Sequence, residues 1–542
     1  MAYTKTRKYC HMFKYFAIPN FTIFLVLAIT LATVVGLGYF LLLPNVPKFA
    51  FAASFLVFLT ALIVRVALTG EVKTERQFSF LTIPLLMLGF WATMQAMFDD
   101  FNIQAIIYHA IYGFASFGIP DLYLELSGLI FSGIVIIGLA MSVGVAQSKF
   151  FSRFDIIALV PLVLFNPLSV ETVKGLGFGA SGKQILPSHY KPLTTLKLNK
   201  PEKPNVLHIY LESAERTLAN EHFFGPVMRP IMELEGRGMS AINIHQTKNT
   251  EWTIAGMVAS NCGVPLIQPW LVSSRNLSST GDRFLPNTIC LGEILKKNGY
   301  HAEHITGADR NFAGKARFYF DHGFSKVTGF DEIYDGYSSH KVHNFLGDSA
   351  VFDYSEKVFR QLSGNNQPFL MTLSSTGGHG PAGFALPSCL DGSVEIKSKK
   401  PIAVGLECAN VMAKNMLDRL EADGLLENTV VIIQSDHLLM GSELASRLNQ
   451  MERRNLFIAF GPGIEPKRIE RPASMMDVFP TILDILGYDI TDDAAGLGIS
   501  LLSQKQNLIE KLGVEKLNDA ILYDADLRRM LWLKEEEAKV LF

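Results

Sequence analysis

The chain has 542 residues, of which 49% are hydrophobic and 18% are charged. This composition is unusually apolar for a purely soluble protein, and the length allows more than one domain. The net charge of −2 argues against a protein that binds the phosphate backbone, so no nucleic-acid partner is expected.

The first 170 residues are predicted to form a transmembrane domain of about five helices. Long uncharged runs alternate there with short polar breaks, and each run approaches or exceeds the ~17 residues needed to cross the bilayer core. Lys and Arg gather before the first span and after the second and fourth, which places the N-terminus inside and residue 170 outside. The five candidate spans are Asn20–Leu43, Phe49–Leu68, Phe78–Phe98, Leu122–Val145 and Phe154–Leu168.

A shorter apolar segment lies in the outer loop between the third and fourth spans. It reads IQAIIYHAIYGFASFG and is interrupted by Tyr108 and His109. Two placements are open: along the outer surface of the membrane, or as a helix packed among the spans.

Residues 171–204 are rich in Gly, Lys, Pro and Thr, which predicts a linker over the membrane surface. Residues 205–500 then alternate short apolar runs typical of strands with helical patterns, which predicts an α/β domain with a mainly parallel sheet.

Three of the strand-like runs deliver polar residues at their carboxyl ends. VLHIYL is followed by Glu212, FLMTL leads through SSTGG to His379, and TVVIIQ leads into Asp436 and His437. Ligands of open α/β sheets bind beyond the carboxyl ends of the strands, so we expect a site there.

The stretch TKNTEWTIAGMVASNCGVPL adds a hydroxyl to this set. Apolar residues recur at helical spacing from Thr253, so Thr250 is predicted at or beside a helix N-terminus, a favourable place for a phosphate. The simpler interpretation is that Thr250 or Thr253 only caps the helix.

Together these residues form a plausible shell for one divalent cation. Glu212 and Asp436 offer carboxylate oxygens, His437 a nitrogen and Thr250 an alkoxide, and both manganese and zinc are compatible with that set. The metal would lower the pKa of the Thr250 hydroxyl and make it a nucleophile. Each residue also has an ordinary explanation, such as a surface Glu or a loop histidine at position 379.

Several long segments resemble a known group of enzymes. They read LESAERTLANEHF, NTEWTIAGMVASNCGVPL, NTICLGEILKKNGY, GADRNFAGKARFYFDHGF and VVIIQSDHLLM. They resemble the phosphoglycerol transferases that decorate osmoregulated periplasmic glucans in Gram-negative bacteria. More distantly, they resemble lipoteichoic acid synthases and phosphoethanolamine transferases of the alkaline phosphatase and sulfatase superfamily.

The resemblance implies roles for individual residues. Thr250 would be the nucleophile, Glu212, Asp436 and His437 metal ligands, and His379 a contact to the transferred phosphate or the leaving oxygen. Lys315 stands near the position at which the synthases carry a substrate-contacting arginine, so substrate binding is implied for Lys315 as well.

The implied enzyme moves phosphoglycerol from phosphatidylglycerol to a periplasmic glucan, with the catalytic domain on the periplasmic side of the inner membrane. The alternatives are transfer of phosphoethanolamine to lipid A or another glycan, hydrolysis of a phosphate or sulfate ester, and a non-enzymatic receptor or scaffold. Because all four candidate ligands are present, the sequence argues against the non-enzymatic alternative.

Two features remain outside the site. Cys262, Cys290, Cys389 and Cys408 fall in the outer domain, where disulfides persist, and they allow three pairings. Chain order and the resemblance favour Cys262 with Cys290 and Cys389 with Cys408. Residues 501–542 predict amphipathic helices, packed on either the catalytic domain or the membrane.

Overall fold

The computed structural model describes residues 163–175, 185–193, 196–198, 202–267, 283–342 and 345–532, with the single positions Met87, Trp91, Gln104, Ala105 and Tyr108. The predicted membrane spans lie outside the described residues, apart from Met87, Trp91 and residues 163–168. Within the described part of the chain, no helix is both long enough and apolar enough to span a bilayer. Gln104, Ala105 and Tyr108 belong to the same compact unit as residues 171–542.

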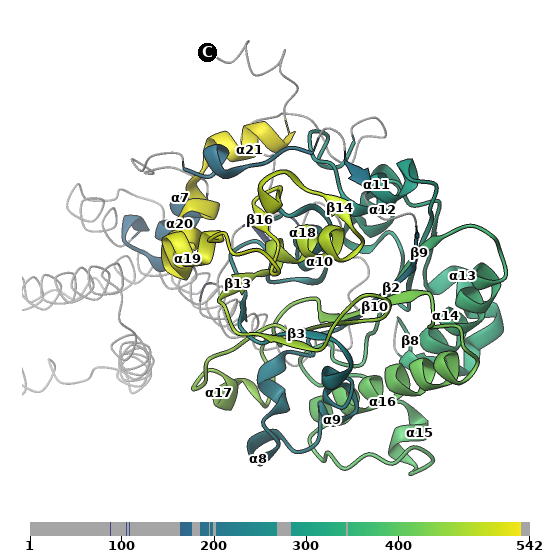
Figure 1. The fold of residues 1–542 in the computed structure, drawn as a ribbon. Coiled ribbons are helices and arrows are strands. Elements are labelled where there is room, and N and C mark those ends of the chain that lie inside the picture. The colour runs from purple at the N-terminus through teal and green to yellow at the C-terminus, as the bar shows by residue number, and fades with distance from the viewer. Residues whose placement is uncertain are drawn as a thin grey trace, which may run out of the picture. The chain divides into compact units, whose positions relative to one another are not determined.

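An eight-stranded sheet forms the centre of this unit, in the order β12-β3-β11-β10-β2-β9-β5-β6 (Figure 1). The central strands β10, β2, β9 and β5 run parallel, and antiparallel pairing occurs where β11 meets β10 and β3. The predicted α/β fold with a mainly parallel sheet is therefore confirmed. The strands are β2 (Asn205–Leu211), β3 (Met239–Ala241), β5 (His301–Thr306), β6 (Lys326–Thr328), β9 (Phe369–Ser374), β10 (Thr429–Ser435), β11 (Phe457–Phe460) and β12 (Lys467–Ile469).

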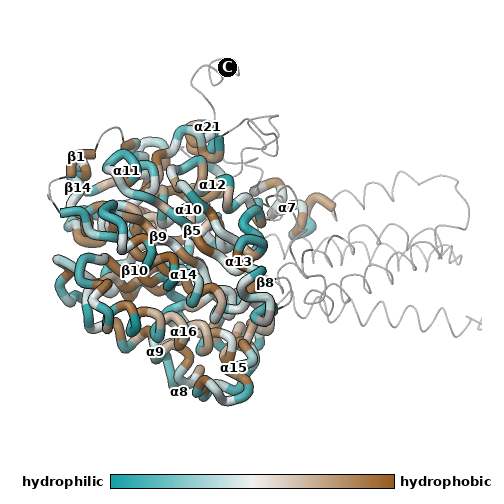
Figure 2. The backbone as a smooth tube through the Cα atoms, turned by 90° about the vertical axis from the view of Figure 1, so that its right-hand side faces the viewer, coloured by the Kyte–Doolittle hydropathy of each residue, from teal (hydrophilic) through white to brown (hydrophobic). Residues whose placement is uncertain are grey.

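The apolar runs of the central strands are explained by burial on both faces of the sheet. Successive side chains of a strand point to opposite faces. Val206 of β2 and Val430 of β10 therefore enter one core, and Leu207 and Val431 enter the other. Figure 2 shows apolar segments gathered at these strands.

Helices cover both faces of the sheet (Figure 1). On one side, called the α10 face, the core includes residues of α10 (Thr253–Cys262), α11 (Leu291–Lys297), α12 (Lys315–Asp321) and α18 (Val478–Ile485). On the other side, called the α16 face, it includes residues of α9 (Arg229–Met232), α13 (Phe330–Tyr337), α14 (Asp348–Ser363), α16 (Pro401–Ala422) and α17 (Ala445–Leu448).

Shorter elements surround this framework. They are helices α8 (Glu221–Phe224) and α15 (Pro387–Leu390) and the strand pairs β4 (Ile244–His245) with β13 (Ala473–Ser474), β7 (Lys341–Val342) with β8 (Phe345–Leu346), and β15 (Ala494–Ala495) with β16 (Gly498–Ile499).

The C-terminal segment forms the predicted amphipathic helices α19 (Leu508–Leu512), α20 (Val514–Tyr523) and α21 (Ala525–Trp532). Their apolar side chains, including Leu517 and Leu531, are buried in the core of the α10 face. Packing on the α/β domain is thus observed for the described part of this tail. Asn518 of α20 also accepts a hydrogen bond from the backbone N–H of Lys248 (2.8 Å).

The stretch predicted to be a linker contains ordered elements in its described parts. Helix α7 (Pro167–Gly175) begins it, and β1 (Lys197–Leu198) pairs antiparallel with β14 (Tyr488–Asp489). The physical reason is that Leu186 is buried in the core of the α10 face. Around Leu186 and β1 the chain therefore lies against the domain.

Candidate active site

Three charged side chains meet where β2 and β10 end. Glu212 follows β2, while Asp436 and His437 follow β10, its parallel neighbour. His437 Nε2 lies 3.2 Å from Glu212 Oε1 and 3.4 Å from Asp436 Oδ2. All three side chains are buried, so the charges face one another away from water.

Backbone groups orient these side chains. His437 Nδ1 donates to the carbonyl of Leu438 (2.8 Å), which directs Nε2 toward the two carboxylates. Ser213 has a left-handed backbone (φ 57°), and its N–H donates to Asp436 Oδ1 (2.9 Å) while its hydroxyl donates to Glu212 Oε1 (3.0 Å). Residue 213 was not predicted, and nothing in the apolar pattern distinguishes it from other serines after strands.

The pKa values in the cluster show that its two buried carboxylates favour a positive charge beside them. Burial, reinforced by the charge of Glu212, raises the pKa of Asp436 to about 7. Burial would lower the pKa of His437, but the charges of Asp436 and Glu212 outweigh it and raise that pKa to about 10. Burial likewise opposes ionisation of Glu212, yet His437 holds the pKa of Glu212 below its ordinary value.

The residues fit a divalent cation. One ligand atom from each of Glu212, Asp436 and His437 lies within 4.8 Å of the others. Asp436 Oδ2 is buried and has no hydrogen-bond partner in the described part of the chain, so it remains available to a cation. Two carboxylates with one imidazole suit zinc or manganese.

Thr250 lies just before the helix that faces this cluster. Helix α10 begins at Thr253, as predicted, and its cap residue is Trp252, so neither threonine is the N-cap. The Thr253 hydroxyl lies 3.4 Å from Glu212 Oε2, which places the helix N-terminus at the cluster. Thr250 is buried, and its hydroxyl donates to the carbonyl of Thr247 (2.7 Å).

Two glycines allow the elements to approach this closely. A Cβ on Gly256 of α10 would lie 1.8 Å from the carbonyl oxygen of Asp436. A Cβ on Gly378 would lie 2.0 Å from the carbonyl oxygen of Glu212. Any side chain at either position would push the helix or the loop away from the candidate ligands.

His379 occupies the loop after β9, the other neighbour of β2. Its Nδ1 donates to the carbonyl of Gly380 (2.9 Å), and its ring stacks on Phe384 with centroids 5.7 Å apart. The charge of His379 contributes to the lowered pKa of Glu212, so the imidazole lies within electrostatic reach of the cluster.

Asp348, which the sequence analysis missed, holds the loop that carries His379. Its two carboxylate oxygens accept the N–H groups of Thr376 (2.7 Å) and Gly377 (2.8 Å). Burial raises the pKa of Asp348 to about 6. The available signal was an acidic residue directly after Gly347 at the start of a helical pattern, which marks a helix N-terminus but not the loop it binds.

Lys315 is buried at the start of α12. Burial lowers its pKa to about 8, although the negative charges of Glu212, Asp309 and Asp436 oppose the shift. The ammonium group of Lys315 is thus close enough to Glu212 and Asp436 for their charges to act on it. The structure therefore brings Glu212, Asp436 and His437 together and places His379 and Lys315 within electrostatic reach of Glu212, while the chemical roles of all five remain predictions.

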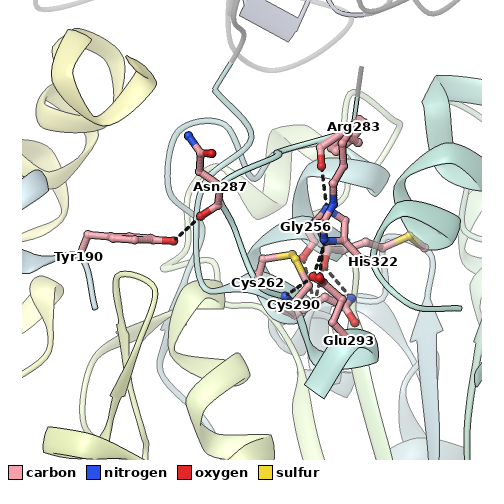
Figure 3. Close-up of a disulfide and its surroundings, with 12 residues drawn as sticks. Tyr190, Gly256, Cys262, Arg283, Asn287, Cys290, Glu293 and His322 are labelled. Atoms are coloured by element: carbon pink, nitrogen blue, oxygen red, sulfur yellow. Dashed lines mark hydrogen bonds and ion pairs between the residues drawn. A yellow bond between two sulfur atoms is a disulfide. The ribbon is translucent and has the colours of Figure 1, made fainter. Parts of the chain in front are cut away.

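Both predicted disulfides are present. Cys262, the last residue of α10, is bonded to Cys290, the residue that caps α11 (Figure 3). Cys389 in α15 is bonded to Cys408 in α16. One disulfide thus lies on each face of the sheet.

A second group of possible metal ligands surrounds the first disulfide but has another explanation. Cys290, Glu293 and His322 offer atoms close to one another. The thiol of Cys290 is consumed by the disulfide, and Glu293 accepts from the Cys290 N–H (3.0 Å) and pairs with His322 (2.8 Å), as Figure 3 shows. This group is a helix cap in which Glu293 is also hydrogen-bonded to the buried imidazole of His322.

The fold and the site agree with a match to a family model. The sulfatase family model matches residues 204–488, so the chain belongs to the sulfatase family. The matched region contains every candidate site residue described above.

Comparison with individual relatives gives a narrower result than the family match. The chain is 33% identical over 305 residues to phosphoglycerol transferase I of Shigella flexneri, a match that covers 56% of this chain and 39% of that protein. It is 30% identical over 456 residues to phosphoglycerol transferase I of Xanthomonas euvesicatoria, covering 78% and 61%. The chain thus spans between two-fifths and three-fifths of these relatives. A solved lipoteichoic acid synthase from Listeria monocytogenes is 20% identical, with a TM-score of 0.46 and coverage of 57% and 79%.

Proposed function

We propose that the protein transfers a phosphoglycerol group from phosphatidylglycerol to a periplasmic glucan, through a covalent intermediate on Thr250. The observation that carries the proposal is the buried cluster of Glu212, Asp436 and His437 against the N-terminus of α10. Relatives named phosphoglycerol transferase I support the choice of the transferred group.

In the first half-reaction, Thr250 Oγ1 attacks the phosphorus of the phosphodiester. The hydroxyl proton passes to solvent, a bond forms between Oγ1 and phosphorus, and the bond from phosphorus to the diacylglycerol oxygen breaks. A divalent cation held by Glu212, Asp436 and His437 would supply positive charge that lowers the pKa of the hydroxyl. The hydroxyl must leave its hydrogen bond to the carbonyl of Thr247 before it attacks.

The surrounding groups stabilise the charge that develops. Lys315 and the N–H groups in the first turn of α10 can bind the phosphate oxygens. His379 Nδ1 is engaged by the Gly380 carbonyl, so Nε2 is the atom that protonates the departing diacylglycerol oxygen.

In the second half-reaction, His379 accepts the proton of a glucan hydroxyl, which restores its protonated form. The hydroxyl oxygen attacks the phosphorus, the bond to Thr250 breaks, and the threonine oxygen takes a proton from solvent to restore the hydroxyl. The kinetics are therefore ping-pong.

We also propose that the protein is anchored in the inner membrane with its catalytic domain in the periplasm. Residues 1–170 anchor the chain in the inner membrane, residues 171–204 connect it to the catalytic domain at 205–500, and residues 501–542 form the tail. A reporter fused after Phe542 should be active only in the periplasm. Activity in the cytosol would refute the predicted number of spans.

The decisive experiment uses the purified full-length protein and phosphatidylglycerol labelled in its headgroup glycerol. With lipid alone we expect diacylglycerol and a phosphoglycerol adduct on Thr250, detected by peptide mass spectrometry. Label should reach a glucan only when one is added. Transfer of phosphoethanolamine from phosphatidylethanolamine, with phosphatidylglycerol left untouched, would reject the donor in favour of the alternative group.

A further inference from the structure

Two buried residues from the N-terminal part of the chain contact residues that directly neighbour Thr250 and Lys315. Gln104 and Tyr108 both have helical backbone and lie four positions apart, the spacing that places side chains on one face of a helix. Both are fully buried in the unit that contains the α/β domain. Neither placement predicted for this segment, along the membrane or among the spans, included a contact with that domain.

Gln104 contacts the residue directly before Thr250. Its Oε1 accepts a hydrogen bond from Asn249 Nδ2 (2.9 Å), and Asn249 is itself buried. The backbone of Asn249 is left-handed (φ 61°), and a conformation of this kind persists only when its surroundings hold it. Gln104 is one of the groups that hold it.

Tyr108 contacts the turn directly before Lys315. Its hydroxyl donates to the carbonyl oxygen of Ala313 (2.6 Å), and Ala313 is a second buried residue with a left-handed backbone (φ 54°). The Tyr108 ring also lies 5.9 Å from the ring of Trp252, the cap residue of α10. One side chain thus contacts both the Lys315 turn and the start of the helix beside Thr250.

We propose that Gln104 and Tyr108 are positioning residues for the active site. Gln104 fixes the backbone that presents the Thr250 hydroxyl, and Tyr108 fixes the turn that presents the Lys315 ammonium. This inference rests on the proposed roles of Thr250 and Lys315. The hydrogen bonds described for the two residues go to Asn249 and Ala313, so the contribution proposed for them is the geometry of the neighbouring Thr250 and Lys315.

The test compares substitutions that preserve size. Gln104→Met removes the acceptor for Asn249, and Tyr108→Phe removes only the hydroxyl that binds Ala313. Tyr300→Phe is the matched control, because the Tyr300 hydroxyl also donates to a backbone carbonyl, that of Pro204 (3.0 Å), at the amino ends of β5 and β2. That end of the strands is opposite to the site.

Two measurements are made on the full-length protein. Hydrogen exchange without substrate reports the order of residues 247–250 and 311–315, and a single turnover with phosphatidylglycerol vesicles reports the rate at which the Thr250 adduct forms. We expect faster exchange in the contacted turn of each variant and adduct formation slowed about 10- to 100-fold, the range that a small misplacement of a reacting group produces. The melting temperature and the KM for lipid should stay close to those of the wild-type protein, and Tyr300→Phe should leave exchange and rate unchanged.

Other outcomes are equally decisive. Unchanged exchange, or faster exchange with an unchanged rate, would overturn the positioning role. Equal slowing in Tyr300→Phe would also overturn it, because the effect would then be general destabilisation. If Gln104→Met fails to fold, Tyr108→Phe alone decides. If the wild-type protein forms no adduct, the proposed function fails, and exchange at the two turns still decides whether Gln104 and Tyr108 order them.

Discussion

The two faces of the central sheet are assembled from different parts of the chain. The core of the α10 face includes Tyr108, Leu186 and Leu531, which lie far from α10 in sequence. The core of the α16 face is formed by residues between Leu207 and Phe460. The side of the site that carries Thr250 therefore depends on remote segments, whereas Asp348, from a helix of the α16 face, holds the loop that carries His379.

The largest expected effect concerns Thr250, the reacting group on the α10 face. Thr250→Ala should reduce adduct formation by at least about 10³-fold, because a missing nucleophile is not replaced by its neighbours. The domain should stay folded, since the hydroxyl bonds only within its own turn among the described residues. Circular dichroism and adduct mass spectrometry check this, and Thr250→Ser, which keeps a hydroxyl, should retain measurable activity. Full activity in Thr250→Ala would refute the covalent mechanism.

The next effect concerns the cluster at the strand ends, which both faces share. Glu212→Gln and Asp436→Asn should each weaken metal binding by more than the roughly 100-fold that loss of an outer contact to a ligand costs. Metal content of the purified variants, measured by plasma mass spectrometry, checks this. Glu303→Gln is a suitable control, because Glu303 lies in β5 outside the cluster. Wild-type metal content in both ligand variants would show that the cluster binds no cation.

The two disulfides directly test the difference between the α10 face and the α16 face, because one disulfide lies on each face. They close loops of 28 and 19 residues, so removing either should cost about 3.5 kcal/mol of stability. Replacing Cys262 and Cys290 with alanine should also slow adduct formation, because Cys262 ends the helix beside Thr250. Replacing Cys389 and Cys408 should leave the rate unchanged. Equal loss of activity in both double variants would contradict the different roles of the faces.

The smallest expected effect is a pH dependence of the folding stability that arises from Asp348, which holds the loop of His379. The pKa of Asp348 is raised from 3.8 to about 6 in the folded state, so its stabilising contribution is present below about pH 4 and is lost as pH rises through 6. The change amounts to about 3 kcal/mol, at roughly 1.4 kcal/mol for each unit of pKa. Asp348→Asn should abolish this part of the dependence in urea unfolding between pH 4 and 7. An unchanged slope in the variant would assign the dependence to another group.

The sequence predicted the parts of the site that follow strands or begin a helix. The apolar runs are directly followed by Glu212, Asp436 and His437, and a helical pattern begins at Thr253. The local sequence pattern was therefore sufficient to place these residues at strand ends and at a helix start. The packing of Gly256 on Asp436 was not predicted, although a glycine inside a helical run often has a packing reason. The contact between Gln104 and Asn249 joins residues 145 positions apart, and no local pattern encodes it.

The hydrogen bond from Lys248 to Asn518 bears on how the protein can be divided for experiments. The family match ends at residue 488, so a fragment cut at its limits would keep every candidate metal ligand and lose Asn518. Gln104 would be lost at the other end. Such a fragment could still bind a cation, although its Thr247–Thr250 turn would lack the contacts from Asn518 and Gln104. Its metal content alone would therefore overstate its catalytic activity. An expression fragment intended for kinetics should therefore be chosen by which residues touch that turn.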